Sequence, residues 1–196
     1  MIVVKFFGGL GNQLFQLFTV IAYGIEHTAT VVLPYVSELH VGTVRSTYWD
    51  TFLIGLRNLT TYNMDVNETN YSLLQMPLYK EPAFHYTEIP KLNYTRTLLF
   101  GYYQSYRYFD KYNDTIQNMI NLPKQQTLIK NEYHDLFLDK ETISMHFRLG
   151  DYKNIQESHP ILTIEYYYNA ICSITMNQDK PYRILYFCQK NDNVDV

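Results

Sequence analysis

His146, Arg148 and Asp151 bring an imidazole, a permanent cation and a carboxylate together within six residues. Arginine presents a rigid charged fork that matches the oxygens of a phosphate or a carboxylate. Histidine changes its charge near neutral pH and can share such a contact or move a proton. This combination predicts a site that stabilises a doubly charged leaving group.

A predicted β-strand positions these groups. Apolar and polar side chains alternate along residues 143–147, with the period of two that is typical of a strand, and Gly150 then introduces a turn. Arg148 is therefore expected at the C-terminal end of the strand, where ligands bind in open α/β sheets. The alternative is a solvated strand face on which His146 and Arg148 form structural ion pairs.

The composition excludes several classes of protein. The chain has 196 residues, a net charge of -3 and a pI of about 6.0, so no basic surplus favours nucleic acid as a partner. It has no long uncharged apolar run and no basic leader, so we expect neither a transmembrane segment nor a signal peptide. Two cysteines without a CxxC pair indicate reduced thiols. We expect a protein of the cytosol, or one peripherally associated with the cytosolic face of a membrane.

A second chemical motif lies near the N-terminus. Residues 2–7 predict a buried strand, glycines follow, and residues 14–24 have helical spacing of apolar side chains. A helix N-terminus after such a turn offers free amides to an anion. The glycines do not complete a dinucleotide fingerprint, because the third glycine position is Leu14, and no Walker lysine follows.

Four residues of this turn are candidate ligand contacts. Gly9 and Gly11 would let the backbone approach a ligand closely. Asn12 and Gln13 place two amide side chains at the top of the sheet, where they can hold a phosphate, a base edge or sugar hydroxyls.

A tyrosine-rich segment follows another predicted strand, at residues 97–100. Its Gln104 and Arg107 could bind sugar hydroxyls. The alternative is that this segment simply packs on the sheet.

The remaining pattern indicates an α/β fold with a parallel sheet. Further strands are expected at 30–35, 97–100 and 182–188, and helices at 112–120, from 125 to about 140, and at 164–174. We predict two domains, residues 1–140 and residues 141–196.

Four segments, in this order, resemble one protein family. Gly8–Gln16, Phe100–Asp110, His146–Tyr152 and Ile164–Ala170 are similar to motifs of the α-1,2-fucosyltransferases of glycosyltransferase family 11. The third of these segments matches the HxRxGDY motif of that family. The matches are spread over the whole chain, and together they are far more specific than any one of them.

The resemblance implies a fold, a reaction and roles for residues. It implies a GT-B architecture, in which a Rossmann-like acceptor domain is followed by a Rossmann-like donor domain. It implies transfer of L-fucose from GDP-β-L-fucose to the 2-hydroxyl of a β-galactoside, with inversion and without a cofactor or metal. Arg148 is expected to hold the donor diphosphate with help from His146, while Asp151 orients the loop. Asn12 and Gln13 are expected to face the donor or the acceptor.

The chain also departs from the family pattern. Many relatives carry a second arginine where this chain has Leu149, and Trp49 is its only tryptophan, so a serine- and tryptophan-rich donor motif is missing. We therefore expect residues 141–196 to be the start of an incomplete GDP-sugar-binding domain, completed by a partner chain or an oligomer. The alternatives are a non-catalytic module that binds glycans or nucleotide sugars, and an inactive remnant of the family.

Overall fold

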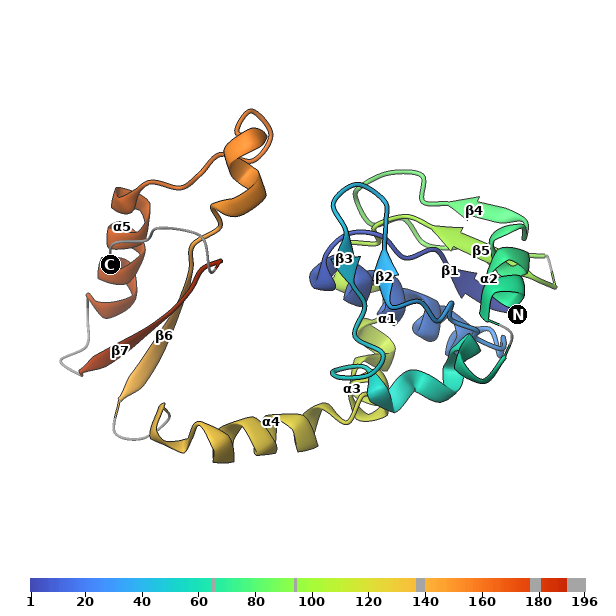
Figure 1. Ribbon diagram of the computed structural model, residues 1–196, viewed down its shortest axis with the longest axis horizontal. Coiled ribbons are helices and arrows are strands. Elements are labelled where there is room, and N and C mark those ends of the chain that lie inside the picture. The colour runs from blue at the N-terminus through green and yellow to red at the C-terminus, as the bar shows by residue number, and fades with distance from the viewer. Residues whose placement is uncertain (65, 94, 137–139, 177–180, 190–196) are drawn as a thin grey trace. The chain divides into compact units, whose positions relative to one another are not determined.

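The chain forms two compact units, Met1–Gln125 and Gln126–Val196. Each holds a small parallel sheet and at least one packed helix, so the predicted α/β class is confirmed (Figure 1). The structure, a computed structural model, describes residues 1–64, 66–93, 95–136, 140–176 and 181–189, without the side chains of residues 66–68 and 151. The assignment of residues 1–140 and 141–196 as acceptor and donor domains stays a prediction.

The sheet of the first unit has three parallel strands in the order β1-β5-β4. They are β1 (Ile2–Val4), β5 (Thr97–Phe100) and β4 (Leu78–Lys80). All three residues of β1 are at most 2% exposed. This double-sided burial explains why β1 is a continuous apolar run, as expected for a central parallel strand.

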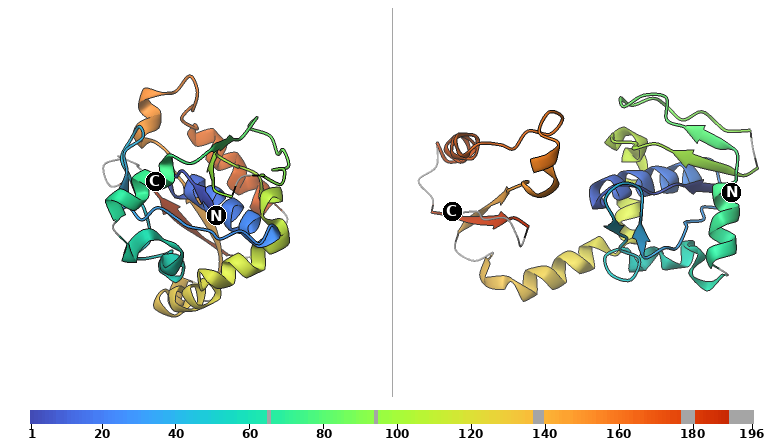
Figure 2. Two further views of the ribbon diagram at one scale, coloured as in Figure 1. Left: turned by 90° about the vertical axis from the view of Figure 1, so that its right-hand side faces the viewer. Right: turned by 45° about the horizontal axis from the view of Figure 1, so that its top comes forward.

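Helices cover both faces of this sheet. On one face, Ile2 and Val4 pack into the main core together with α1 (Leu10–Glu26). On the other face, Val3 packs with Leu73, which lies in α2 (Val66–Leu74). Figures 1 and 2 show α1 running alongside the sheet. Because side chains alternate along β1, its residues pack into two separate layers of the core, one on each face of the sheet.

The strand predicted at residues 30–35 is wrong in its extent. This segment lies beside β1 but makes only isolated bridges, Ile2 to Val31 and Leu33 to Thr60. Pro34 has no N–H to continue a ladder, so the pairing passes from β1 to another part of the chain within a few residues.

Between residues 63 and 91 the chain forms the helix α2, which the sequence analysis missed, and then the short strand β4. The other elements of the first unit are β2 (Glu38–Leu39), β3 (Arg45–Ser46), α3 (Asn113–Met119) and 3-10 helices at Ile54–Leu59, Thr61–Asn63, Tyr106–Tyr108 and Asp110–Tyr112. Strands β2 and β3 form an antiparallel hairpin.

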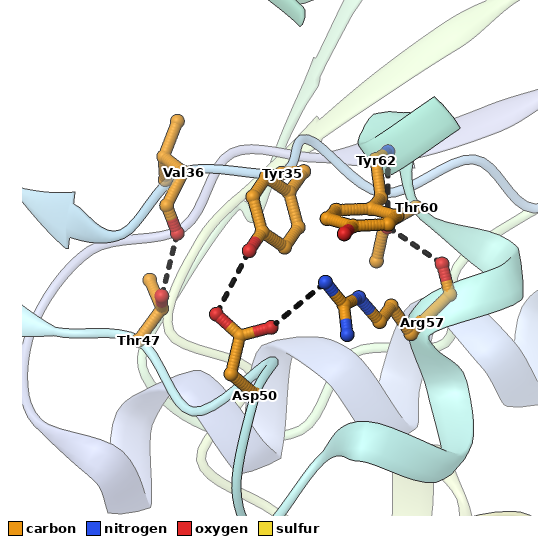
Figure 3. A network of polar contacts seen from close by, with 7 residues as sticks. All are labelled: Tyr35, Val36, Thr47, Asp50, Arg57, Thr60 and Tyr62. Atoms are coloured by element: carbon orange, nitrogen blue, oxygen red, sulfur yellow. Dashed lines mark hydrogen bonds and ion pairs between the residues drawn. The ribbon is translucent and has the colours of Figure 1, made fainter. Parts of the chain in front are cut away.

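A polar network fixes the chain where residues 30–35 end. Figure 3 shows Asp50 between Tyr35, whose hydroxyl donates to it at 2.8 Å, and Arg57, which pairs with it at 3.4 Å. The Arg57 guanidinium lies 3.5 Å from the ring centroid of Tyr62. The hydrogen bond to Asp50 raises the pKa of Tyr35, because a phenolate would face a carboxylate. Because both charges reach solvent, this network sets geometry more than stability.

The second unit is a βαβ arrangement. Its strands β6 (Glu141–His146) and β7 (Tyr182–Phe187) pair in parallel along six residues each, and α5 (Ile164–Thr175) connects and packs on them (Figure 2). Both strands and α5 were predicted. The helix predicted up to about residue 140 is shorter: α4 (Leu122–Glu132) is followed by a 3-10 helix, His134–Leu136.

Across the described residues, none of the helices combines the length and the apolar character that crossing a bilayer requires.

Two glycines of α1 allow a matched test of its packing. A Cβ on Gly24 would overlap the Val31 side chain, whereas a Cβ on Gly11 would have no atom within 4 Å. Gly24→Ala should therefore lower the free energy of unfolding by about 1–3 kcal/mol, the usual cost of overpacking. Gly11→Ala should raise it by up to about 1 kcal/mol through helix propensity. Urea unfolding measures both, and equal effects of the two substitutions would contradict this packing.

Candidate functional site

The turn after β1 depends on one glycine. Gly8 has φ +82°, in the left-handed region, and a Cβ there would collide with the side-chain amide of Asn12. Gly9 is extended at φ -72° and precedes the first residue of α1. Gly9 and Gly11 each have open space where a Cβ would lie. Close approach of a ligand to these two glycines stays a prediction.

The buried side chain of Gln16 pairs with the backbone of Phe7, just beyond the end of β1. Its side chain is 0% exposed, and its Oε1 accepts from the Phe7 N–H at 3.2 Å while its Nε2 donates to the Phe7 carbonyl at 3.2 Å. One side chain thus pairs both polar groups of a backbone that has left the sheet. The sequence analysis missed this role, although a glutamine within the apolar spacing of a helix was the available signal.

Gln13 is turned inward rather than toward solvent. It is 3% exposed, and its Nε2 donates to the carbonyls of Gly8 and Ser46, each at 3.0 Å. These contacts fasten the glycine turn to β3. The predicted contact of Gln13 with a ligand stays a prediction, but the donors of its amide already serve the turn.

Asn12 connects two of the sequence motifs. Its Oδ1 accepts from Nε2 of Gln104 at 2.7 Å, across 92 positions of sequence. Asn12 is half-buried and Gln104 is exposed, so this amide pair lies at the surface. Arg107 lies elsewhere, with its guanidinium 4.1 Å from the ring centroid of Tyr86. The two predicted sugar contacts of the tyrosine-rich segment thus have different partners within the first unit.

A pocket of about 540 Å³ lies at the carboxyl ends of the three strands of the first unit. Lys5 follows β1, Lys80 ends β4 and Phe100 ends β5, and all three line it. The other lining residues are Phe7, Val41, Glu81, Pro82, Ala83, Phe84, Gly101 and Tyr102. The volume is in the usual range for small-molecule sites, about 300–1,000 Å³. Sequence reasoning missed this pocket, because its residues come from strand ends that are far apart in the chain.

Glu81 organises one wall of this pocket. Its Oε2 accepts from the backbone N–H groups of Tyr102 at 2.8 Å and Tyr103 at 2.9 Å, and its Oε1 accepts from the Tyr108 hydroxyl at 3.2 Å. Tyr103 is 0% exposed and adopts φ 52°, so the chain turns sharply after β5. Burial, with the Glu81 charge as a second cause, raises the pKa of Tyr103.

The segment of residues 146–151, with its histidine and arginine, lies at the carboxyl end of a strand, as the sequence analysis predicted. Strand β6 ends at His146, and Phe147 still donates to the carbonyl of Phe187 at 2.8 Å. Met145 and Phe147 are buried, while His146 is exposed and Arg148 is half-buried. This confirms the alternation predicted for the end of the strand and places Arg148 just beyond the carboxyl end of β6.

An aromatic ring lies beside Arg148. Its guanidinium lies 4.9 Å from the ring centroid of Tyr152, which stacks at 4.8 Å and 20° on the ring of His159. Such stacking fixes the orientation of a guanidinium. Asp151 belongs to the 3-10 helix Gly150–Asn154, but its side chain lies outside the described part of the chain, so its role stays a prediction.

His146 is also placed beside a pocket. The residues 143–146 and α5 line a pocket of about 280 Å³, and the Tyr167 hydroxyl donates to the carbonyl of His146 at 3.1 Å. This hydrogen bond fixes the end of β6 against α5. Nothing in the described ranges brings three or more His, Cys, Asp or Glu side chains together as a metal site. The absence of a required metal or cofactor stays a prediction.

The chain matches no protein-family model, no curated protein and no solved structure. The sequence motifs and the geometry of each unit are therefore the features that bear on function.

Replacing Gln16 tests the closure of β1. Gln16→Leu keeps the size of the side chain but leaves the Phe7 N–H and C=O without their partner, at a cost of about 1–3 kcal/mol per buried group. We expect the free energy of unfolding to fall by about 2 kcal/mol or more in urea titrations. Gln75→Leu, the same change at an exposed position, should stay within about 0.5 kcal/mol. Similar losses in both variants would refute the role of Gln16.

The buried phenol of Tyr103 predicts a dependence of stability on alkaline pH. Because its pKa is raised in the folded state, its contribution is complete below the unfolded pKa of about 10 and is lost as the pH rises above that value. One proton accounts for about 1.4 kcal/mol per pH unit. Urea midpoints at pH 8 to 11 should therefore fall less steeply for Tyr103→Phe than for the wild type. Tyr106→Phe, at a 64% exposed tyrosine, should follow the wild-type slope.

Proposed function

We propose that the protein is a glycosyltransferase that moves L-fucose from GDP-β-L-fucose to the 2-hydroxyl of a β-galactoside, with inversion and without a metal. The observation that carries this proposal is the Asn12–Gln104 hydrogen bond of 2.7 Å. It joins the first two family-like motifs at the carboxyl edge of a parallel sheet, although 92 positions separate them in sequence. Two motifs that meet at the usual ligand-binding edge support one shared site.

The second support is the position of Arg148. In an inverting transfer, a bond forms between the acceptor O2 and the anomeric carbon while the bond from that carbon to the diphosphate breaks. The acceptor hydroxyl loses its proton to a base, and GDP leaves with added negative charge. An arginine at the end of a strand, oriented by the Tyr152 ring, suits the stabilisation of that charge. His146, the last residue of β6, would assist Arg148.

The proposal includes a division of labour between the units. The first unit, with its glycine turn and its pocket, is the acceptor side of a GT-B enzyme in this scheme. The second unit, with a parallel β6–α5–β7 arrangement, belongs to the GDP-sugar side. This arrangement follows from the resemblance, and each unit alone is compatible with it.

A second candidate is a glycan-binding module without catalysis. The specific observation that favours it is the pocket lined by Phe7, Phe84 and Tyr102, which lies entirely within residues 1–125. Aromatic walls with a few polar groups suit a sugar ring, and such a pocket needs no second unit to bind one.

A transfer assay with arginine variants tests the proposal. The wild-type chain should release GDP from GDP-fucose only when a β-galactoside is present. Arg148→Ala should lower this rate by roughly 10²–10³, because one transition-state cation is lost. Arg148→Lys should recover part of it, since the charge remains without the planar fork.

Arg183→Ala is the matched control. Arg183 lies on the neighbouring strand β7 and donates from Nη1 to the carbonyl of Asp135 at 2.8 Å, a structural contact of the same unit. Its loss should lower the melting temperature without a selective loss of rate. Galactoside binding without GDP release would establish the module instead, and equal rate losses at both arginines would remove Arg148 from the chemistry.

A further inference from the structure

The pocket at the strand ends of the first unit has a chemical character that the proposed transfer does not require. A neutral galactoside needs aromatic faces and hydrogen-bonding groups, but this pocket also has two lysines. Lys5 is half-buried and Lys80 is exposed, and each stands at the end of a different strand.

The two ammonium groups are not neutralised within the part of the chain that the structure describes. The ion pairs found there involve Arg57, Lys111 and His134, and none includes Lys5 or Lys80. The Lys5 ammonium lies 5.5 Å from the ring centroid of Phe100, a cation–π contact that holds it over the pocket wall without cancelling its charge.

The single carboxylate of the pocket is already occupied. Glu81 accepts three hydrogen bonds, from the backbone N–H groups of Tyr102 and Tyr103 and from the Tyr108 hydroxyl. Its oxygens therefore face the wall that they organise. Counting Lys5 and Lys80 against Glu81 leaves one positive charge in excess among the lining residues.

The aromatic wall suits a ring with an apolar face. Phe84 is 79% exposed, unusually high for a phenylalanine, and its ring stacks on Tyr102 at 6.0 Å and 30°. Phe7 meets the same tyrosine edge-on at 4.7 Å. The three rings form a continuous apolar surface beside the lysines, and large exposed apolar patches rimmed by charge mark binding surfaces.

We infer that this pocket binds an anionic sugar, in which one ring face packs on Phe84 and Tyr102 while a carboxylate or phosphate group pairs with Lys80 and Lys5. The inference rests on the proposed function in one respect: it makes the acceptor of the fucosyl transfer an acidic glycan. The binding itself needs neither GDP-fucose nor turnover, so it can be tested without them.

Binding of two matched sugars to the full chain tests the inference. Methyl β-glucuronide and methyl β-glucoside differ only at a carboxylate, and ligand-observed NMR titration gives a dissociation constant for each. The glucuronide should bind roughly fivefold more tightly, as expected for one solvent-exposed charge pair, and its advantage should shrink in high salt. Inorganic phosphate alone should bind more weakly than the glucuronide, because it has no ring. A phosphate sugar, glucose 6-phosphate, shows which anionic group is preferred.

Three variants separate the two parts of the site. Lys80→Gln should reduce the preference for glucuronide, because only Lys5 then remains to pair with the carboxylate, and should leave glucoside binding unchanged. Phe84→Ala, at an exposed position, should weaken both sugars by a similar factor. Lys91→Gln, an exposed lysine of the same unit outside the pocket, should change neither.

The inference is overturned if glucuronide and glucoside bind equally, if neither binds, if phosphate alone matches the glucuronide, or if Lys80→Gln keeps the preference in full. Failure of the proposed function looks different: the glucuronide preference would persist while GDP-fucose gives no transfer to methyl β-galactoside or to methyl β-galacturonide.

Discussion

The polar backbone of Phe7, just beyond the end of β1, must be paired where the chain leaves the sheet, and this requirement shapes the first unit. Gln16 meets it by bonding to both the N–H and the C=O of Phe7. The adjacent turn can then leave the sheet through Gly8, in a conformation that other residues rarely adopt. Because an unpaired buried polar group is costly, Gln16, Gly8 and the start of α1 depend on one another for this arrangement.

Hydrogen bonds between a side chain and the backbone also determine the structure of the pocket wall. Glu81 follows β4 directly and bonds to successive backbone N–H groups just after β5. A carboxylate that accepts backbone donors in this way fixes a loop with charge-assisted bonds, which are stronger than neutral ones. Lys5 and Lys80, at the neighbouring strand ends, do not organise a loop in this way. Because the backbone of the described residues uses the carboxylate of Glu81 but not the two ammonium groups, this edge of the sheet favours an anionic ligand.

Local periodicity was sufficient to predict most of the regular elements. The order of apolar and polar residues within each segment was enough to identify strands β5 and β7, the carboxyl half of β6, and helices α1 and α5. Residues 30–35 were predicted as a strand from apolar content, but Pro34 and the pairing with residues 59–61 limit it to single bridges. That outcome depends on tertiary partners, which no local window contains.

The candidate sites divide in a similar way. Arg148 was predicted at a strand end because alternation and a following glycine are local signals. Gln16 and Glu81 were missed because their roles consist of bonds to backbone groups, which leave no residue pattern of their own. Gln13 was predicted to face a ligand, yet the structure uses its amide to join the turn to the β2–β3 hairpin. Amide side chains near a site serve either purpose, and only the partner atoms distinguish them.

Helix α4 has a consequence for how the chain can be divided experimentally. Gln125 anchors its first turn to the carbonyl of Phe52, but no residue of the helix is buried. Its amides should exchange with solvent far sooner than those of α1, since little more than its own ladder holds it. A protease, which binds an unwound peptide, should therefore cut within α4 first. The two fragments would then show which half of the molecule retains each ligand.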